Sequence, residues 1–514
     1  MGEQQEVKIM KKIFPGFLII KLTVFLTLQS FGQSNTYWTR SFNEESSLLS
    51  GAVVGGGSGP TAIYYNPASI SEVEASKLSV NASLFSFDFI NVKNALGDDI
   101  HIKTSRGAVE PRFVSYMIKS KAFKKWSFEI AILNNELSKA EITESIDKMD
   151  DILTGIPGDE RYYAVYHYNS QFRDDWFGLG GSVRLNENLS AGGSMFLTVK
   201  SMKYSESLDI ESYSFNDSIY QYGEYVPFYV ASSAYTEYLK FNDYRFTWKA
   251  GLVYESERFS AGISLTTPSL GGIYSDGKRS SRIASQSNIT NPETEQPVPD
   301  YIVADYKEKG EMKIGFKTPF SIAAGFNYHY PGRGRAFYTS VEYFAGIDPY
   351  RMVEAEESSN IGVDYGLGKV NYNEWLTYVN GNRPVFNAAF GYSWTLRKDL
   401  LLMGGFRTDF NNRKNYDFGQ FTDYNKTRSI DVNLYHLTCG LSANVLGQDI
   451  ITGIQYSVGH TWDQKQIADL ADPVEYLPEQ GLALQGIPDY SSKSWYNAIS
   501  IYFGASFNFG GEEK

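Results

Sequence analysis

The sequence contains little of what several large classes of protein require. Its 514 residues include a single cysteine, Cys439, so no disulfide can form within one chain. There is no Gly-x-Ser-x-Gly motif for a nucleophile elbow. The five histidines are scattered, without the spacing of metal ligands: His101, His167, His329, His436 and His460. We therefore expect a protein that is not an enzyme and that carries no metal or cofactor.

Charge and hydropathy exclude two further classes. The net charge is −12 and no cluster of Lys and Arg is present, which argues against nucleic acid as a partner. Only one apolar run approaches the length of a membrane-spanning helix, at the extreme N-terminus, so a helical membrane bundle is excluded. Acidic clusters such as Asp98-Asp99 could bind Ca²⁺ or bridge lipopolysaccharide, but such runs more often form a solvated surface.

The N-terminal run has the features of an export signal. Two lysines follow Met10, then comes an apolar stretch, and small residues at Ser30 and Gly32 suit cleavage after Gly32. Residues 1–32 are therefore expected to be a signal peptide, with translation starting at Met1 or Met10. The alternative is a single transmembrane anchor, which Lys21 within the apolar stretch disfavours.

Aromatic residues are abundant and the rest of the chain repeats one device. Tyr and Phe number 38 and 33, which suits a β-barrel with aromatic girdles at both membrane interfaces. Pairs of alternating segments are joined by a few polar residues, as expected of hairpins. The pairs are Trp176–Leu185 with Leu189–Val199, Tyr244–Tyr254 with Phe259–Thr266, Ser321–His329 with Ala336–Phe344, Phe386–Trp394 with Leu400–Phe410, and Leu437–Asn444 with Ile450–Val458.

The last segment, Trp495–Phe509, shows the alternation best. One face carries Ile499, Ile501 and Phe503, and the other carries Ala498 and Ser500. An apolar outside with a small or polar inside is typical of a barrel wall in lipid. A soluble β-sandwich would alternate in the same way, but fifteen such segments behind an export signal favour the barrel.

The lengths of the connections predict the number of strands. Bacterial barrels normally have an even number, with short turns at one end and long loops at the other. The count becomes fourteen if residues 171–174 are a bend within one long strand, Arg161–Leu185. Long outer loops are then expected at 91–108, 136–160, 201–242, 268–317, 346–383, 411–429 and 460–494. The sequence thus predicts an all-β, antiparallel transmembrane barrel at residues 76–510, followed by a polar tail at 511–514.

Residues 33–75 precede the first strand and fit no strand pattern. Gly55, Gly57 and Gly59 allow tight backbone turns, while Asn66 and Pro67 favour the start of another. A phosphate-binding loop is excluded because its Lys-Ser/Thr ending is absent. The apolar residues among them favour a segment packed inside the barrel over a flexible leader.

This opening resembles that of the FadL/TodX family of outer-membrane transporters for long-chain fatty acids and other hydrophobic compounds. The similar residues are the glycine-rich leader and Tyr64-Tyr65-Asn66-Pro67-Ala68, with pattern-level similarity at Leu185–Gly193 and Lys317–Tyr328. The family commonly continues its Asn-Pro-Ala motif with Gly-Leu, where this chain has Ser69-Ile70. The resemblance implies that residues 33–75 form a hatch, with Asn66, Pro67 and Ala68 in its architecture.

The resemblance also implies a mechanism and a location. Outer loops would collect a hydrophobic ligand, which would pass through an internal pocket and exit sideways through the wall into the membrane. The candidate collecting residues are Tyr220, Tyr222, Tyr225, Phe228, Tyr229 and Tyr235, which could equally pack the loops together. The protein would be a monomer in the outer membrane of a Gram-negative bacterium, in contact with membrane lipids and lipopolysaccharide. The alternative is an interaction barrel that serves protein secretion or surface assembly, with a protein partner at its outer loops.

Overall fold

The structure is a computed structural model. It describes residues 35–38, 41–42, 44–72, 77–119, 125–153, 158–214, 230–287, 302–309, 312–354, 362–364, 368–370, 376–414, 427–445, 448–477, 480 and 482–508. The predicted signal peptide and the polar tail lie outside these residues. No helix among those described is long and apolar enough to cross a membrane.

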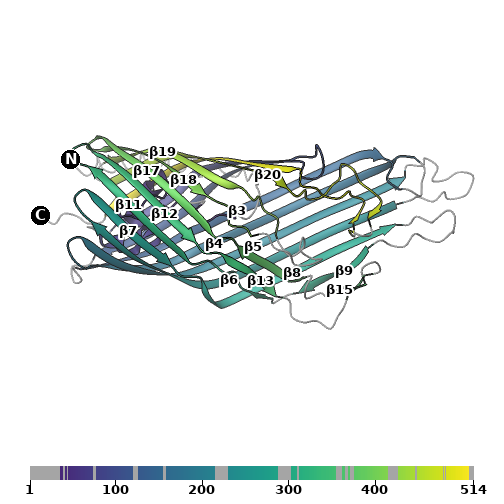
Figure 1. The fold of residues 1–514 in the computed structure, drawn as a ribbon, viewed down its shortest axis with the longest axis horizontal. Coiled ribbons are helices and arrows are strands. Elements are labelled where there is room, and N and C mark those ends of the chain that lie inside the picture. Colours follow the sequence, from purple (N-terminus) through teal and green to yellow (C-terminus); the bar gives the residue numbers. More distant parts are fainter. Residues whose placement is uncertain are drawn as a thin grey trace, which may run out of the picture.

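Within the described residues, fourteen antiparallel strands close into one barrel (Figure 1). The last strand pairs with the first, from Lys77 opposite Asn508 to Lys93 opposite Lys493. The predicted fold class and strand number are confirmed. The wall strands are β1 Lys77–Lys93, β2 Ile102–Lys119, β3 Trp126–Asp150, β4 Glu160–Arg184, β5 Leu189–Ser214, β6 Val230–Glu255, β7 Phe259–Thr266, β11 Ser321–Tyr330, β12 Arg335–Phe344, β17 Val385–Arg397, β18 Leu400–Asp409, β19 Asn433–Val445, β20 Gln448–Gln464 and β23 Ser492–Asn508.

Side chains alternate across the wall as the sequence predicts. In β23, Ile499 and Phe503 are exposed on the outside, whereas Ala498, Ser500 and Tyr502 are buried inside. The same outward apolar band runs around the barrel, and it includes Phe87, Phe128, Ile130, Leu179, Leu252, Ile263, Phe390, Leu437 and Ile454. Such a band is the surface that a barrel presents to hydrocarbon.

The short turns lie at the end where β1 begins and β23 ends, which we call the short-turn end. At the opposite, extended end, β3 to β6 continue far beyond the apolar band (Figure 1). β3 pairs with β4 up to Asp150 opposite Glu160, with one register shift between Asn134 and Glu136. β5 pairs with β6 without a break up to Tyr213 opposite Val230. The predicted bend at 171–174 lies inside the continuous β4, so the interpretation of Arg161–Leu185 as one strand is confirmed.

The prediction of long loops at 136–160 and 201–242 was therefore wrong, because most of these residues are strand. Their outer faces carry mostly polar residues such as Ser, Thr, Lys and Asp, and so lack the apolar outside by which wall strands were recognised. The interval 268–317 was also taken as loop. It contains β8 Leu270–Ser287, β9 Ile302–Lys309 and β10 Lys313–Ile314, of which β8 pairs with the upper part of β6.

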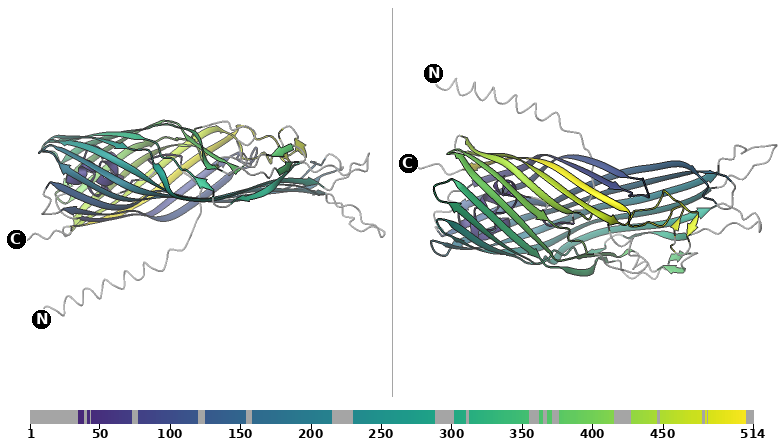
Figure 2. Two further views of the ribbon diagram at one scale, coloured as in Figure 1. Left: turned by 90° about the horizontal axis from the view of Figure 1, so that it is seen from below. Right: turned by 45° about the horizontal axis from the view of Figure 1, so that its top comes forward.

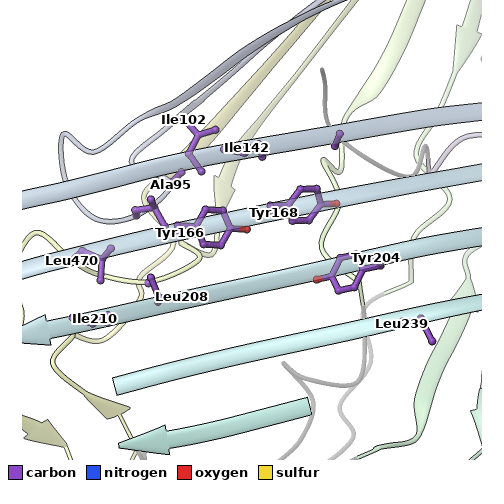
Figure 3. Packing of buried hydrophobic residues seen from close by; sticks show 14 of the residues in the cluster. Ala95, Ile102, Ile142, Tyr166, Tyr168, Tyr204, Leu208, Ile210, Leu239 and Leu470 are labelled. Atoms are coloured by element: carbon purple, nitrogen blue, oxygen red, sulfur yellow. The ribbon is translucent and has the colours of Figure 1, made fainter. Parts of the chain in front are cut away.

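Connections at the extended end cover the inner face of this tall wall. They contain β13 Ile347–Glu354, β14 Gly362–Asp364, β15 Gly368–Val370, β16 Tyr378–Asn382, β21 Tyr476–Leu477 and β22 Leu482–Ala483. Figure 3 shows wall residues such as Tyr166 and Leu208 in one cluster with Ala95 and Leu470 from the connections. The extended end is thus a packed structure with its own apolar core.

The N-terminal segment lies inside the barrel, in the half nearer the short turns (Figure 2). Its short helices are α2 Glu44–Leu48, η2 Gly59–Thr61, α3 Ala62–Tyr65 and η3 Pro67–Glu72. Helix α2 contacts β18, β19, β20 and β23, while η3 contacts β3 to β6, so the segment spans the barrel. Small inward side chains bond to its backbone: Ser115 Oγ donates to Pro60 O and Ser194 Oγ to Ile63 O.

Candidate functional site

Asn66 links the N-terminal segment to the wall. Its side-chain Nδ2 donates to the carbonyl oxygens of Val54, Leu252 and Ile263 at 2.9, 3.2 and 3.4 Å. Its Oδ1 accepts from the backbone N–H of Ala68 at 3.2 Å, which fixes the turn into η3. The side chain is fully buried, so its hydrogen bonds form where water does not compete for them.

Glycines in the wall make room for this segment, and sequence reasoning missed them. A Cβ at Gly251 of β6 would lie 2.0 Å from Asn66 Oδ1, and one at Gly192 of β5 would lie 2.3 Å from Pro67 O. Gly192 requires glycine because it lies against the backbone of Pro67 and Ala68, and Gly251 requires it because it lies against the buried side chain of Asn66. Their signal in the sequence was the small residues on the inward face of each strand.

The predicted leader glycines lie in the same region. Gly55 packs against the backbone of Gly325 in β11, where a Cβ on either residue would clash. Gly57 and Gly59 have positive φ angles of 73° and 51°, and the Gly57 N–H donates to Glu72 Oε2 at 2.8 Å. These residues and the Asn66 turn belong to one folded unit. We call this unit, the described residues from 35 to 72, the hatch.

A cavity of about 100 Å³ lies between the hatch and the connections of the extended end. Its lining comes from the start of the hatch, from β3 to β5, and from connections that include β13 and β16. The lining residues used below are Tyr37, Asn135, Phe172, Asp174, Lys200, Phe316, Thr318 and Pro319. Sequence reasoning identified none of these as pocket residues, because the cavity lining comes from nine separate stretches of chain.

Asp174 is the most buried charged group of the cavity. Lys200 Nζ and Asn135 Nδ2 donate to its Oδ2 at 2.6 and 3.0 Å. Asn135 Oδ1 in turn accepts from the hydroxyl of Tyr64 in the hatch, at 3.1 Å. The cavity floor and the hatch therefore share one hydrogen-bond network.

Aromatic rings form another side of the cavity. Phe316 lies 5.6 Å from Phe172 and 6.3 Å from Phe241 between ring centroids, and the Lys200 ammonium lies 5.2 Å from the Phe316 centroid. The backbone N–H of Phe316 donates to Asp243 Oδ2 at 2.7 Å. The cavity thus combines an apolar side with a charged end.

The wall next to the cavity is interrupted. β7 pairs with β6 and β11 as far as Thr266, but β8, which begins at Leu270, pairs with β6 and β9. Across this interruption Thr318 N donates to Ser269 Oγ at 2.9 Å, and Ser269 N to Thr318 O at 3.3 Å. We call residues 267–270 together with 316–319 the seam; Phe316 to Pro319 also line the cavity.

A second charged group lies above the cavity, in the extended end. Glu206 of β5 is buried and accepts hydrogen bonds from the hydroxyls of Tyr204 at 2.6 Å and Tyr166 at 3.1 Å. The guanidinium of Arg428 pairs with the same carboxylate. This pair attaches the connection before β19 to the tall wall.

The candidate collecting residues are only partly visible. Tyr235 lies in β6 and is half-buried against the apolar cluster of the extended end. The other five lie outside the described residues: Tyr220, Tyr222, Tyr225, Phe228 and Tyr229. Their role in collecting ligand stays a prediction.

Comparison with solved structures identifies the fold. A TodX monoaromatic hydrocarbon channel, a deltaS2 mutant, superimposes with a TM-score of 0.51 at 12% identity, covering 91% of this chain and 99% of that one. The chain has the FadL/TodX fold. The Pseudomonas putida toluene transporter TodX gives 0.49 at 11% identity, covering 94% and 100%, and the CymD monoaromatic hydrocarbon channel gives 0.48 at 12%, covering 92% and 100%. No protein-family model and no curated protein matches the sequence.

Proposed function

We propose that this protein is an outer-membrane transporter that takes up hydrophobic small molecules by diffusion, and that it is not an enzyme. The observation that carries the proposal is a barrel closed by its own N-terminal segment, with an internal cavity that reaches an interruption in the wall. The FadL/TodX fold supports it, since the solved structures with that fold are named as channels and transporters.

The seam supports lateral exit into the membrane. An apolar compound that left through water would lose about 0.8 kcal/mol per CH₂ relative to hydrocarbon, so a path through the wall is favoured. Beside the seam, Leu270 and Tyr274 of β8, which are opposite Phe246 and Tyr244 of β6, are more than half exposed. A compound that passed Phe316 and Thr318 would therefore meet an apolar outer surface.

The cargo class extends from single-ring compounds to long-chain fatty acids. A long acyl chain needs a longer cavity than the one present, so its passage would require the hatch or the connections to move. The transporter would act as a monomer in the outer membrane of a Gram-negative bacterium, in contact with lipids and lipopolysaccharide. Residues 1–32 would be removed on export.

The experiment is to close the seam with a disulfide. Ser269→Cys and Thr318→Cys are combined in a Cys439→Ser background, and uptake of radiolabelled toluene and oleate is measured in bacteria that express the protein. We expect the oxidised double variant to lose most of the uptake, and a reductant to restore it. Whichever of toluene and oleate is taken up only by cells that express the barrel identifies the preferred class of cargo.

The matched control is a disulfide within the regular wall. Val341 of β12 and Ala388 of β17 are directly opposite each other in register, so V341C/A388C adds a bond where the ladder is already complete. Its uptake should equal that of the C439S parent. Uptake that persists in the double variant with the seam closed would refute lateral exit. Uptake by the C439S parent equal to that of cells without the protein would refute transport.

The second candidate, an interaction barrel, is favoured by the tall wall of β3 to β6, which is more than a transporter of small molecules requires. A stable complex with an exported protein, in a barrel that shows no uptake, would establish it.

A further inference from the structure

The cavity is small, and its size limits what it holds. A buried cavity of about 150 Å³ accommodates a benzene molecule, so a cavity of about 100 Å³ is of the order of one small ring. The apolar side formed by Phe172 and Phe316 suits such a ring, because aromatic rings pack favourably when offset or edge to face.

The charged end of the cavity has an unused hydrogen-bond acceptor. Asp174 is 1% exposed, and its Oδ2 accepts from both Lys200 and Asn135. Its Oδ1 is fully buried without a hydrogen-bond partner among the described residues, and so is the hydroxyl of Thr318 on the same cavity. Buried polar atoms are normally paired, and a carboxylate oxygen can only accept.

We propose that the cavity selects a ring-sized molecule with an apolar body and one hydrogen-bond donor, such as the hydroxyl of a phenol, which donates to Asp174 Oδ1. Because Oδ1 has almost no accessible surface in this structure, the donor reaches it when the groups that cover it move slightly aside. The ring lies against Phe172 and Phe316. This inference rests on the proposed function and makes it more specific, because it adds a polar contact to a path for hydrophobic compounds. A pure hydrocarbon would leave the acceptor unpaired, and an acceptor-only compound would be repelled by it.

The test compares three probes of similar size: 4-fluorophenol, 4-fluorobenzaldehyde and fluorobenzene. Their binding to the full barrel in lipid nanodiscs is measured by fluorine NMR, with empty nanodiscs as the reference for partition into lipid. We expect 4-fluorophenol to bind at least about tenfold more tightly than the other two, the factor expected for one hydrogen bond to a charged group.

Asp174→Asn reverses the chemistry of the site without changing its shape. Lys200 and Asn135 both donate to the Oδ2 position, so the new amide must place its oxygen there and its NH₂ group where Oδ1 was. The variant should bind 4-fluorobenzaldehyde more tightly than 4-fluorophenol. Asp175→Asn is the matched control, because Asp175 is the next residue of β4 and pairs with Arg173, away from the cavity; it should keep the wild-type order.

The wild-type series decides the question even if D174N does not fold. Equal binding of the three probes, or no binding above that of empty nanodiscs, overturns the inference. If seam-dependent uptake of toluene persists in that case, the proposed function stands without it. If uptake is absent as well, both are refuted.

Discussion

Gly192 of β5 lies so close to Pro67 of the hatch that a Cβ on the glycine would be 2.3 Å from the proline carbonyl oxygen and 2.4 Å from its carbonyl carbon. Neither atom belongs to a flexible side chain. The hatch therefore seats backbone against backbone, and its position depends on the absence of a methyl group in the wall.

Gly192→Ala should displace the hatch. The added Cβ overlaps the backbone of Pro67 and Ala68, and overpacking of this kind costs about 1–3 kcal/mol. We expect a lower unfolding temperature and a higher ion conductance of single barrels in a planar bilayer. Gly193→Ala is the control, since its Cβ would meet only Lys249 O at an ordinary 3.6 Å. Equal conductance of the two variants would contradict the backbone seat.

Asn66→Asp should loosen the hatch from the other side. The carboxylate keeps the acceptor for Ala68 N but loses the donor to Val54 O, Leu252 O and Ile263 O. A buried acceptor without its donor costs about 1–3 kcal/mol. The ion conductance of single N66D barrels should be higher than that of the wild type. Asn188→Asp, in the exposed turn before β5, should leave the conductance unchanged. A sealed N66D barrel would show that these bonds do not hold the hatch.

Arg428→Met should release the connection before β19 from the tall wall. It leaves the buried Glu206 carboxylate with only the hydroxyls of Tyr166 and Tyr204 as partners. The loss in free energy of unfolding is expected near the lower end of about 3–5 kcal/mol, because Arg428 is one-third exposed. Amides of residues 427–432 should exchange faster with deuterium. Adding Glu206→Gln removes the unpaired charge and should recover part of the protection. No recovery in the double variant would mean that the charge is not the cause.

The tip of the β3–β4 hairpin should be less stable at higher pH. Burial raises the pKa of Glu160 above its ordinary value of 4.5, against the lowering effect of the N–H groups of Ile152 and Leu153, which donate to Oε2 at 2.9 and 3.2 Å. The folded tip therefore holds a proton that the unfolded chain has lost, and stability falls as pH rises from about 4.5 through the folded pKa.

The measurement is deuterium exchange at the Ile152 and Leu153 amides, corrected for intrinsic rates, across that pH range. Protection should decline with pH in the wild type. Glu160→Gln, which keeps the acceptor and cannot titrate, should give a flat profile. A decline of the same size in E160Q would assign the effect to another group.

Cys439 reports on the outer face of the barrel. It is exposed on β19 between the outward-facing Leu437 and Leu441, so in a membrane it should face hydrocarbon. A charged thiol reagent should fail to label it in lipid nanodiscs and should label it fully after unfolding. Rapid labelling in the nanodisc would place this face in water.

The sequence predicted those features that depend on short-range pattern. The alternation in β23 follows from side chains two residues apart. The strand number and the continuity of β4 follow from the sequence of short turns and long connections. The Asn66 turn was recognised from local chemistry and from its resemblance to a known family.

The features that were not predicted depend on long-range contacts or on the surroundings of a strand. Asp174 and Thr318 look like ordinary wall and loop residues until the barrel brings them to one cavity. The strand character of 136–150 and 201–214 was missed because their outer faces are polar. Apolar residues such as Tyr204 and Leu208 lie on the inner face, and a strand in water needs no apolar outside.

The length of β4 has a consequence for how a compound reaches the barrel. Crossing a membrane takes roughly 10 tilted residues, and β4 has 25. The remaining 15 or so span roughly 50 Å along the strand, which lifts the mouth clear of the lipid headgroups. Capture from the surroundings and delivery to the bilayer would then happen at different heights of a single wall.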